Sequence, residues 1–199
     1  MYTYSFPGKS ISLLALFPFL FYLTANSQVR YISTTANLTI NGTSTLHDWT
    51  MTSVKVQCDA TFELTPTGQI TAVRSISFST PVNALKSEHS AMDNNAYKAL
   101  KSDKDPQISF TATSVTIAPA PAGASQVTVT GKLNIAGATR DAQILAVCQP
   151  NLSDNTITVS GKENISMKDF SIVPPTFMLG TIKTGNDITL SFKLTLKRA

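Results

Sequence analysis

The chain has 199 residues, of which 42% are hydrophobic and only 14% charged, with a formal net charge of +4 and two cysteines. This length suits one domain, and the apolar fraction is too high for a disordered chain. Two cysteines cannot build a disulfide-rich scaffold or a four-thiolate zinc site, and the mild positive charge argues against a nucleic-acid-binding protein.

The chain begins with a segment typical of an export signal. Ile11–Leu23 is an apolar run that is too short to cross a bilayer, which takes about 20 residues. Ala25 and Ser27 place small side chains before the expected cleavage between Ser27 and Gln28. We expect residues 1–27 to be a signal peptide and residues 28–199 to be a periplasmic or secreted domain without a stable membrane anchor. An uncleaved anchor is the alternative.

Alternation of apolar and polar residues dominates the rest of the chain. It is strictest in Asp187–Leu196, where every second residue is apolar, and Gln126–Ile135 shows a similar pattern. Turn-forming residues separate about eight segments that we expect to be strands: 29–40, 54–64, 70–78, 108–117, 126–135, 139–149, 157–167 and 187–196. This spacing predicts an all-β protein, either a barrel or a sandwich.

One segment predicts a short helix. In Asp93–Lys101, Asp93 is expected to accept hydrogen bonds from the exposed amides at the helix start, and Lys98 suits the negative end of the helix dipole. Pro106 follows and prevents continuation.

The polar residues offer few arrangements for catalysis. The two histidines are His47, beside Asp48, and His89, beside Glu88. A Ser-His-Asp triad would lack the Gly-x-Ser-x-Gly elbow, and a metal site built from both histidines with Glu88 or Asp93 would lack typical ligand spacing. We therefore expect no enzyme, no metal and no cofactor, and interpret the histidines as loop and turn residues.

Glu163 is the unusual residue of its predicted strand. It has the parity of Ile157, Val159 and Ile165, so it would point inward, where a buried carboxylate needs a partner or a proton. We favour a bulge near Gly161 that turns it outward. The alternative is a polar anchor for the head group of a ligand in an apolar cavity.

Cys58 and Cys148 are expected to stay unpaired. An oxidising compartment favours a disulfide, which remains the alternative. However, the two residues fall on the second and sixth predicted strands, far apart in an up-and-down barrel. A disulfide needs α-carbons within about 7 Å.

Several short motifs, in this order and spacing, resemble the YceI-like family. They are Val82–Ser87, Met92–Asn94, Ala99-Leu100, Pro106–Phe110, Gly131–Thr139 and Lys168–Pro175. The resemblance covers most of the chain from about Asn41 onward. Where many family members carry an arginine two residues before the Asp-Phe pair, this chain has Met167.

The resemblance implies an eight-stranded antiparallel, lipocalin-like β-barrel with one short helix. Some family members hold a polyisoprenoid or isoprenoid-quinone chain inside the barrel, which implies an apolar, lipid-like ligand here. We expect a set of large apolar side chains to form the wall or mouth of the lumen, although ordinary core explains each nearly as well: Phe62, Phe78, Phe110, Phe170, Phe177, Met178 and Phe192. Trp49 is expected to plug one end of the barrel, and Met92 and Tyr97 to close another.

Two classes of function follow. The first is a non-enzymatic carrier or storage protein for a long apolar ligand. The second is a barrel filled by its own side chains, acting through its surface as a stress-related or structural protein.

Overall fold

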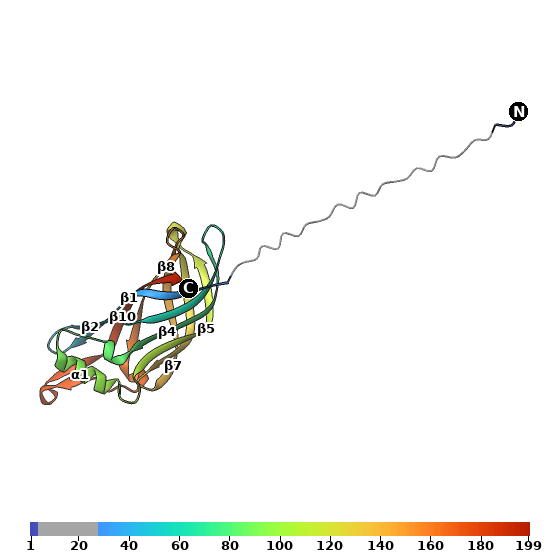
Figure 1. Ribbon diagram of the computed structural model, residues 1–199. Helices are drawn as coiled ribbons and strands as arrows, with labels where there is room; N and C mark the ends of the chain where they lie inside the picture. Colours follow the sequence, from blue (N-terminus) through green and yellow to red (C-terminus); the bar gives the residue numbers. More distant parts are fainter. Residues whose placement is uncertain (4–27) are drawn as a thin grey trace.

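The structure is a computed structural model that describes residues 1–3 and 28–199. The signal-peptide prediction for residues 1–27 therefore falls almost wholly outside the described residues. The described chain folds as one antiparallel β-barrel with a single α-helix at one end (Figure 1). Its strands are β1 (Gln28–Ser44), β2 (Trp49–Ser53), β3 (Gln57–Leu64), β4 (Ile70–Pro81), β5 (Gln107–Pro119), β6 (Ser125–Ile135), β7 (Ala138–Asn151), β8 (Thr156–Ser166), β9 (Thr176–Phe177) and β10 (Ile182–Arg198).

Eight strands close the barrel, as the sequence predicted. The hydrogen-bonded order is β1-β3-β4-β5-β6-β7-β8-β10, and β10 returns to pair with β1 from Tyr31↔Arg198 to Ser44↔Thr184. Each strand is antiparallel to its neighbours, so the chain runs up and down around the wall. Closure gives each of these eight strands a hydrogen-bonded neighbour on both sides.

Two short strands were not predicted from the sequence. β2 pairs with residues 38–42 of β1, beyond the residues of β1 that pair with β3, and β9 is a two-residue partner of β10. The predicted strand from Val54 to Leu64 starts later, at Gln57, and Val54 is exposed. Ser33 holds the start of β3 in place, because its hydroxyl donates to the Val56 carbonyl at 3.1 Å and accepts from the Cys58 N–H at 3.0 Å.

The helix α1 (Ser90–Ala99) begins three residues before its predicted start. The His89 carbonyl accepts from the N–H groups of Met92 and Asp93, which fixes the first turn there. Asp93 does not cap that turn, since its carboxylate accepts instead from Ser87 outside the helix. The helix ends at Ala99, two residues before the predicted end, and Lys101 has a positive φ of 55° that prevents the helix from continuing through it.

Two glycines let aromatic rings lie against the wall. A Cβ on Gly131 would sit 2.5 Å from the Phe110 ring, and one on Gly161 would sit 2.4 Å from the Phe192 ring. In both places the ring on the neighbouring strand covers the glycine, as in aromatic rescue of strand glycines.

The core is solid at the end of the barrel away from α1. Phe62, Val127, Ile157 and Leu196 are at most 2% exposed and lie within two residues of strand ends there. Tyr31 packs edge-to-face on Phe62 with ring centroids 5.6 Å apart. These side chains fill that end, and the hollow part of the lumen begins above them.

Candidate functional site

The barrel encloses a cavity of about 450 Å³, within the usual range for small-molecule sites. All eight barrel strands contribute to its lining, and so does α1. The strict alternation of β10 puts five apolar side chains on the inner face: Ile188, Leu190, Phe192, Leu194 and Leu196. The cavity wall is therefore almost entirely hydrocarbon, which suits an apolar ligand.

The mouth of the cavity lies at the α1 end. Met92 and Ala96 of α1 line it, together with Trp49 at the start of β2. The Trp49 indole N–H donates to the Thr43 carbonyl at 3.0 Å. Trp49 and Met92 thus stand at the same end of the barrel, and the prediction that they close different ends is wrong. The cause is β1, which ends at the helix end of the barrel, so that the turn after it places Trp49, the first residue of β2, there beside Gly42 (Figure 1).

Tyr97 does not line the cavity. Its hydroxyl donates to the Leu85 carbonyl at 2.7 Å and contacts the Asn83 carbonyl at 3.1 Å. The Lys86 ammonium lies 5.1 Å from the centre of the Tyr97 ring, a cation–π contact. Tyr97 therefore holds α1 to the segment that follows β4, and it closes nothing.

A buried carboxylate fastens α1 over the mouth. Asp93 accepts from the Ser87 N–H at 2.7 Å and from the Ser87 hydroxyl at 2.8 Å, and Lys86 Nζ lies 3.6 Å away. Burial tends to raise the pKa of Asp93, but the Ser87 hydrogen bonds and the Lys86 charge together outweigh burial and lower it. The helix is thus tied down by an ionised group.

Loops complete the rim. Phe177 and Met178 line the cavity next to the start of β10, and the Thr45 N–H donates to the Lys183 carbonyl at 3.0 Å, which ties the β1–β2 turn to β10. Leu46 and Leu179 are exposed on this rim. The rim therefore presents apolar side chains directly beside the opening.

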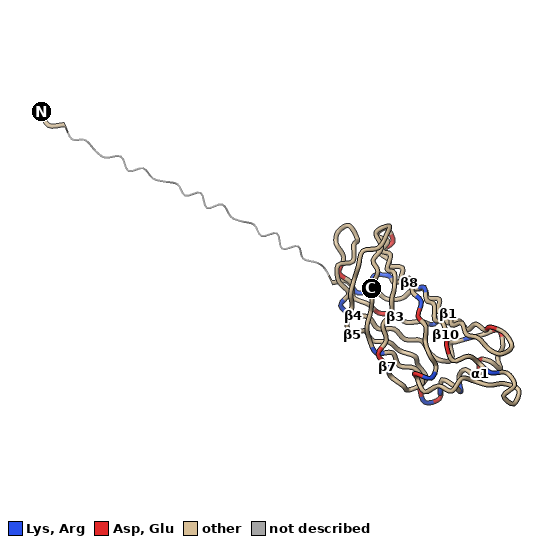
Figure 2. The backbone as a smooth tube through the Cα atoms, turned by 180° about the vertical axis from the view of Figure 1, so that it is seen from behind, with Lys and Arg blue, Asp and Glu red and all other residues tan. Residues whose placement is uncertain are grey.

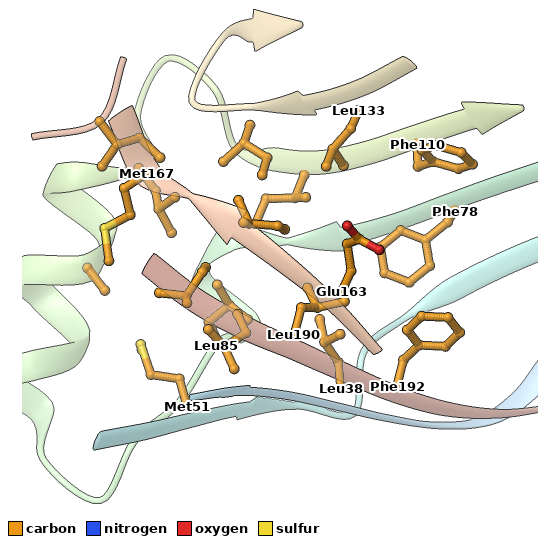
Figure 3. Close-up of a pocket in the computed structure, with 18 of the residues that line it drawn as sticks. Leu38, Met51, Phe78, Leu85, Phe110, Leu133, Glu163, Met167, Leu190 and Phe192 are labelled. Atoms are coloured by element: carbon orange, nitrogen blue, oxygen red, sulfur yellow. The ribbon is translucent and has the colours of Figure 1, made fainter. Parts of the chain in front are cut away.

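The structure brings six of the seven predicted wall residues together. Phe62, Phe78, Phe110, Phe177, Met178 and Phe192 all line the cavity. Phe78 and Phe110 are direct partners on β4 and β5, so their rings share one stretch of wall (Figure 3). Phe170 is the exception: it is buried in the short 3₁₀ turn after β8 and packs into the core instead of lining the cavity.

Sequence analysis missed much of the aliphatic and helical lining. Ile144 on β7, Ile76 on β4 and Ala99 on α1 line the cavity, and none of them was predicted to be a wall residue. Period-2 alternation signals which strand residues share a face, but it does not tell at which height the lumen is hollow. The alanines of α1 carry no sequence signal of this kind.

Glu163 points into the lumen, so the favoured prediction of an outward-turning bulge is wrong. The β8–β10 ladder runs without a register shift through Phe192↔Gly161 and Leu190↔Glu163. Regular pairing keeps Glu163 on the inner face with Ile165, and it lines the cavity (Figure 3). Burial raises the pKa of its carboxyl, although a hydrogen bond from the Asn164 backbone acts in the opposite direction.

The two thiols are free, as predicted. Cys58 on β3 and Cys148 on β7 are buried and both line the cavity. Three strands separate β3 from β7 in either direction around the barrel, so the two residues lie on opposite walls. Burial raises the pKa of each thiol to about 12, which keeps both neutral.

A metal site built from both histidines was a disfavoured alternative in the sequence. Among residues 1–3 and 28–199, no group of three His, Cys, Asp or Glu side chains is arranged to hold a metal ion. His47 and His89 both lie at the cavity mouth, and Asp93 is engaged with Ser87.

Charged residues are interspersed around the barrel. Figure 2 shows Lys and Arg positions mixed with Asp and Glu positions, without a single basic stripe. Exposed pairs include Lys132 with Asp141 at 2.7 Å and Arg30 with Asp59. In the part of the chain that the structure describes, no helix has the length and hydropathy needed to cross a membrane.

Together these features define a closed antiparallel barrel with a hydrocarbon-lined lumen that opens at one end. Residues 60–196 match the YceI-like domain, which covers most of the chain, and the protein belongs to this family. No curated protein sequence matches it.

Solved structures share the fold at low sequence identity. The protein BcnA of Burkholderia cenocepacia is 17% identical, with a TM-score of 0.64 over 80% of this chain and 95% of that one. A polyisoprenoid-binding domain from Saccharophagus degradans, implicated in plant cell wall breakdown, is 14% identical, with a TM-score of 0.61 over 87% of this chain and 100% of that one. The Campylobacter jejuni YceI protein is 18% identical, with a TM-score of 0.53 over 71% of this chain and 81% of that one.

Proposed function

We propose that this protein is an exported, non-enzymatic carrier or store for a long apolar ligand, a polyisoprenoid or an isoprenoid quinone, held in the barrel lumen. The observation that carries the proposal is the continuous apolar cavity, open at the α1 end and floored by Phe62 and Val127. Each CH₂ group moved from water into such a cavity contributes about 0.8 kcal/mol. A long hydrocarbon chain therefore supplies most of the binding free energy, and the wall needs few polar contacts.

Two further observations support the proposal. The wall carries flat aromatic rings and branched aliphatic chains instead of paired acid, base and nucleophile groups. The Saccharophagus degradans domain with the same fold binds polyisoprenoids. The cavity also argues against the alternative of a barrel filled by its own side chains, because a lumen of that kind would leave no ligand-sized space.

Export is part of the proposal. The apolar run Ile11–Leu23 and the small residues Ala25 and Ser27 predict cleavage before Gln28. Amino-terminal analysis of the mature protein should begin at Gln28. A membrane-retained chain that still carries Lys9 would contradict export by cleavage.

The binding proposal is tested by placing a tryptophan at one position that faces the lumen and, as a control, at the next position, which faces outward. Ile144 lines the cavity, whereas the neighbouring Leu145 is exposed on the outside of β7. Ile144→Trp should weaken the binding of an isoprenoid quinone by about tenfold to a hundredfold, because the indole takes space that the ligand needs and overpacking the ligand-filled lumen costs about 1–3 kcal/mol. Leu145→Trp adds the same ring outside and should leave affinity unchanged.

Thermal unfolding of both variants accompanies the binding measurement. If the lumen of the ligand-free protein has free space, the indole of Ile144→Trp occupies that space and the melting temperature stays close to that of the wild type. A wild type that binds no isoprenoid, or equal affinities in the two variants, would exclude the lumen as the binding site and favour the surface-acting barrel.

A further inference from the structure

The cavity lining contains one acidic side chain, that of Glu163. Its carboxylate turns into the lumen among Phe78, Leu190 and Phe192 (Figure 3). Within the described residues, the carboxylates that form ion pairs are elsewhere, on Asp59, Glu63, Asp93 and Asp141. In the part of the chain that the structure describes, Glu163 forms no ion pair, and the Asn164 backbone donates a hydrogen bond to its carboxylate.

Filling the lumen with hydrocarbon would leave this carboxyl group without water. A buried polar group that loses its hydrogen bonds is destabilised, and an ionised one more so. A ligand that is apolar throughout would therefore bind against this penalty. A ligand that brings a matching polar group to Glu163 would avoid it.

The position of Glu163 along the wall fixes where that polar group would lie. Glu163 is three residues from the end of β8 at the mouth, and Ile157 in the filled end lies six residues further down. At 3.3 Å per residue these separations are roughly 10 Å and roughly 20 Å along the strand. The geometry fits a ligand that enters tail first and leaves its head group just inside the mouth.

We propose that Glu163 selects the head group of the ligand: it accepts a hydrogen bond from a hydroxyl or amino group and excludes a phosphate or carboxylate from that depth. This inference rests on the proposed function, since it assumes that an apolar chain fills the lumen. An anionic head group would meet the Glu163 carboxylate in surroundings of low dielectric constant, where repulsion between like charges is strong. A hydroxyl group donates to the carboxylate, an ammonium group forms an ion pair with it, and a quinone carbonyl accepts a hydrogen bond from the protonated carboxyl group.

Proton uptake distinguishes these head groups. Burial already raises the pKa of Glu163, and a head-group-free hydrocarbon would remove its remaining water and favour the protonated form further. Hydrocarbon affinity should therefore fall as the pH rises, whereas an amine keeps the carboxylate ionised. The other titratable side chains that line the cavity are His47 and His89 at the mouth and the neutral thiols of Cys58 and Cys148.

The experiment compares ligands that share one chain: geranylgeraniol, geranylgeranylamine and geranylgeranyl monophosphate. Each is titrated into the full mature chain and into Glu163→Gln, which keeps the shape and removes the charge. Asp187→Asn is the matched control, because Asp187 is exposed near the same end and does not line the cavity. The wild type should bind the amine and the alcohol at least about tenfold more tightly than the phosphate.

Glu163→Gln should tighten phosphate binding and weaken amine binding, each by about tenfold, while the alcohol changes little. It should also remove the part of the fall in phosphate affinity with rising pH that comes from ionisation of Glu163, a part that Asp187→Asn retains. An amine-to-phosphate ratio that is the same in the wild type and Glu163→Gln, or one that Asp187→Asn changes equally, would overturn the inference. If all three ligands bind equally well, the carrier function survives and head-group selection fails; if none binds, both fail.

Discussion

Asp93→Ala should destabilise the barrel by about 2–3 kcal/mol, because hydrogen bonds to a charged group contribute about 1.5–3 kcal/mol each and the second bond here shares one acceptor atom. The acceptor is the carboxylate oxygen that receives both the N–H and the hydroxyl of Ser87, at 2.7 and 2.8 Å. The Lys86 contact at 3.6 Å adds little, since that ammonium is mostly exposed. Urea unfolding of the wild type and the variant measures the difference.

A matched series tests the reasoning. Asp93→Asn keeps an acceptor oxygen for Ser87 and should cost about 1 kcal/mol, because the bond loses its charge. Asp103→Ala removes an exposed carboxylate just beyond α1 and should cost less than about 0.5 kcal/mol. Hydrogen exchange should show faster opening of α1 in Asp93→Ala alone. A loss of stability in Asp93→Ala no greater than that in Asp103→Ala would refute the role of this anchor.

The effect of Asp93 also has a definite pH dependence. Its folded-state pKa lies below the ordinary value of 3.8, so the carboxylate stabilises the fold above pH 3.8. This stabilisation is lost as the pH falls through the folded-state pKa. The stability difference between the wild type and Asp93→Asn should therefore be constant near neutral pH and shrink below pH 3.8.

Three other predictions concern the wall and floor of the lumen. Gly161→Ala should cost about 1–3 kcal/mol in urea unfolding, since its Cβ would lie 2.4 Å from the Phe192 ring and 2.6 Å from the Leu145 carbonyl oxygen and force a shift; an unchanged midpoint would show that both the ring and the neighbouring backbone are free to move. Cys58 and Cys148 should react with a thiol reagent slowly in the fold and as two free groups once unfolded, because burial raises both pKa values to about 12; finding no free thiol would contradict their placement on opposite walls. Phe62→Ala should cost about 3–5 kcal/mol in the same unfolding assay, because Phe62 is 2% exposed in the filled end; a small loss would mean that this end is loosely packed.

The barrel was predictable from the sequence because strand periodicity is a local property. The five apolar residues of β10 alternate without a break, and all five reach the cavity. The same parity argument places Glu163 inside the barrel. An outward-turning bulge was preferred because burying a charge is costly, but the lumen is hollow at this height, so Glu163 is only half-buried and the cost is smaller.

The errors concern features that depend on distant parts of the chain. Asp93 looked like a helix cap because the sequence does not show that Ser87 folds back to its carboxylate. Trp49 and Met92 lie far apart in sequence, and both reach one mouth because β1 ends there, just before Trp49, and α1 lines the same end. Phe170 fits an apolar wall by residue type, but the turn after β8 places it in the core.

The most direct test of the carrier proposal is native mass spectrometry of the full mature protein isolated from its own source. We expect a mass above that of the polypeptide, and we expect the excess mass to be lost on organic extraction, with the released compound carrying an isoprenoid chain. A protein that has only its polypeptide mass, and that takes up no isoprenoid alcohol or quinone when titrated, would contradict the carrier proposal.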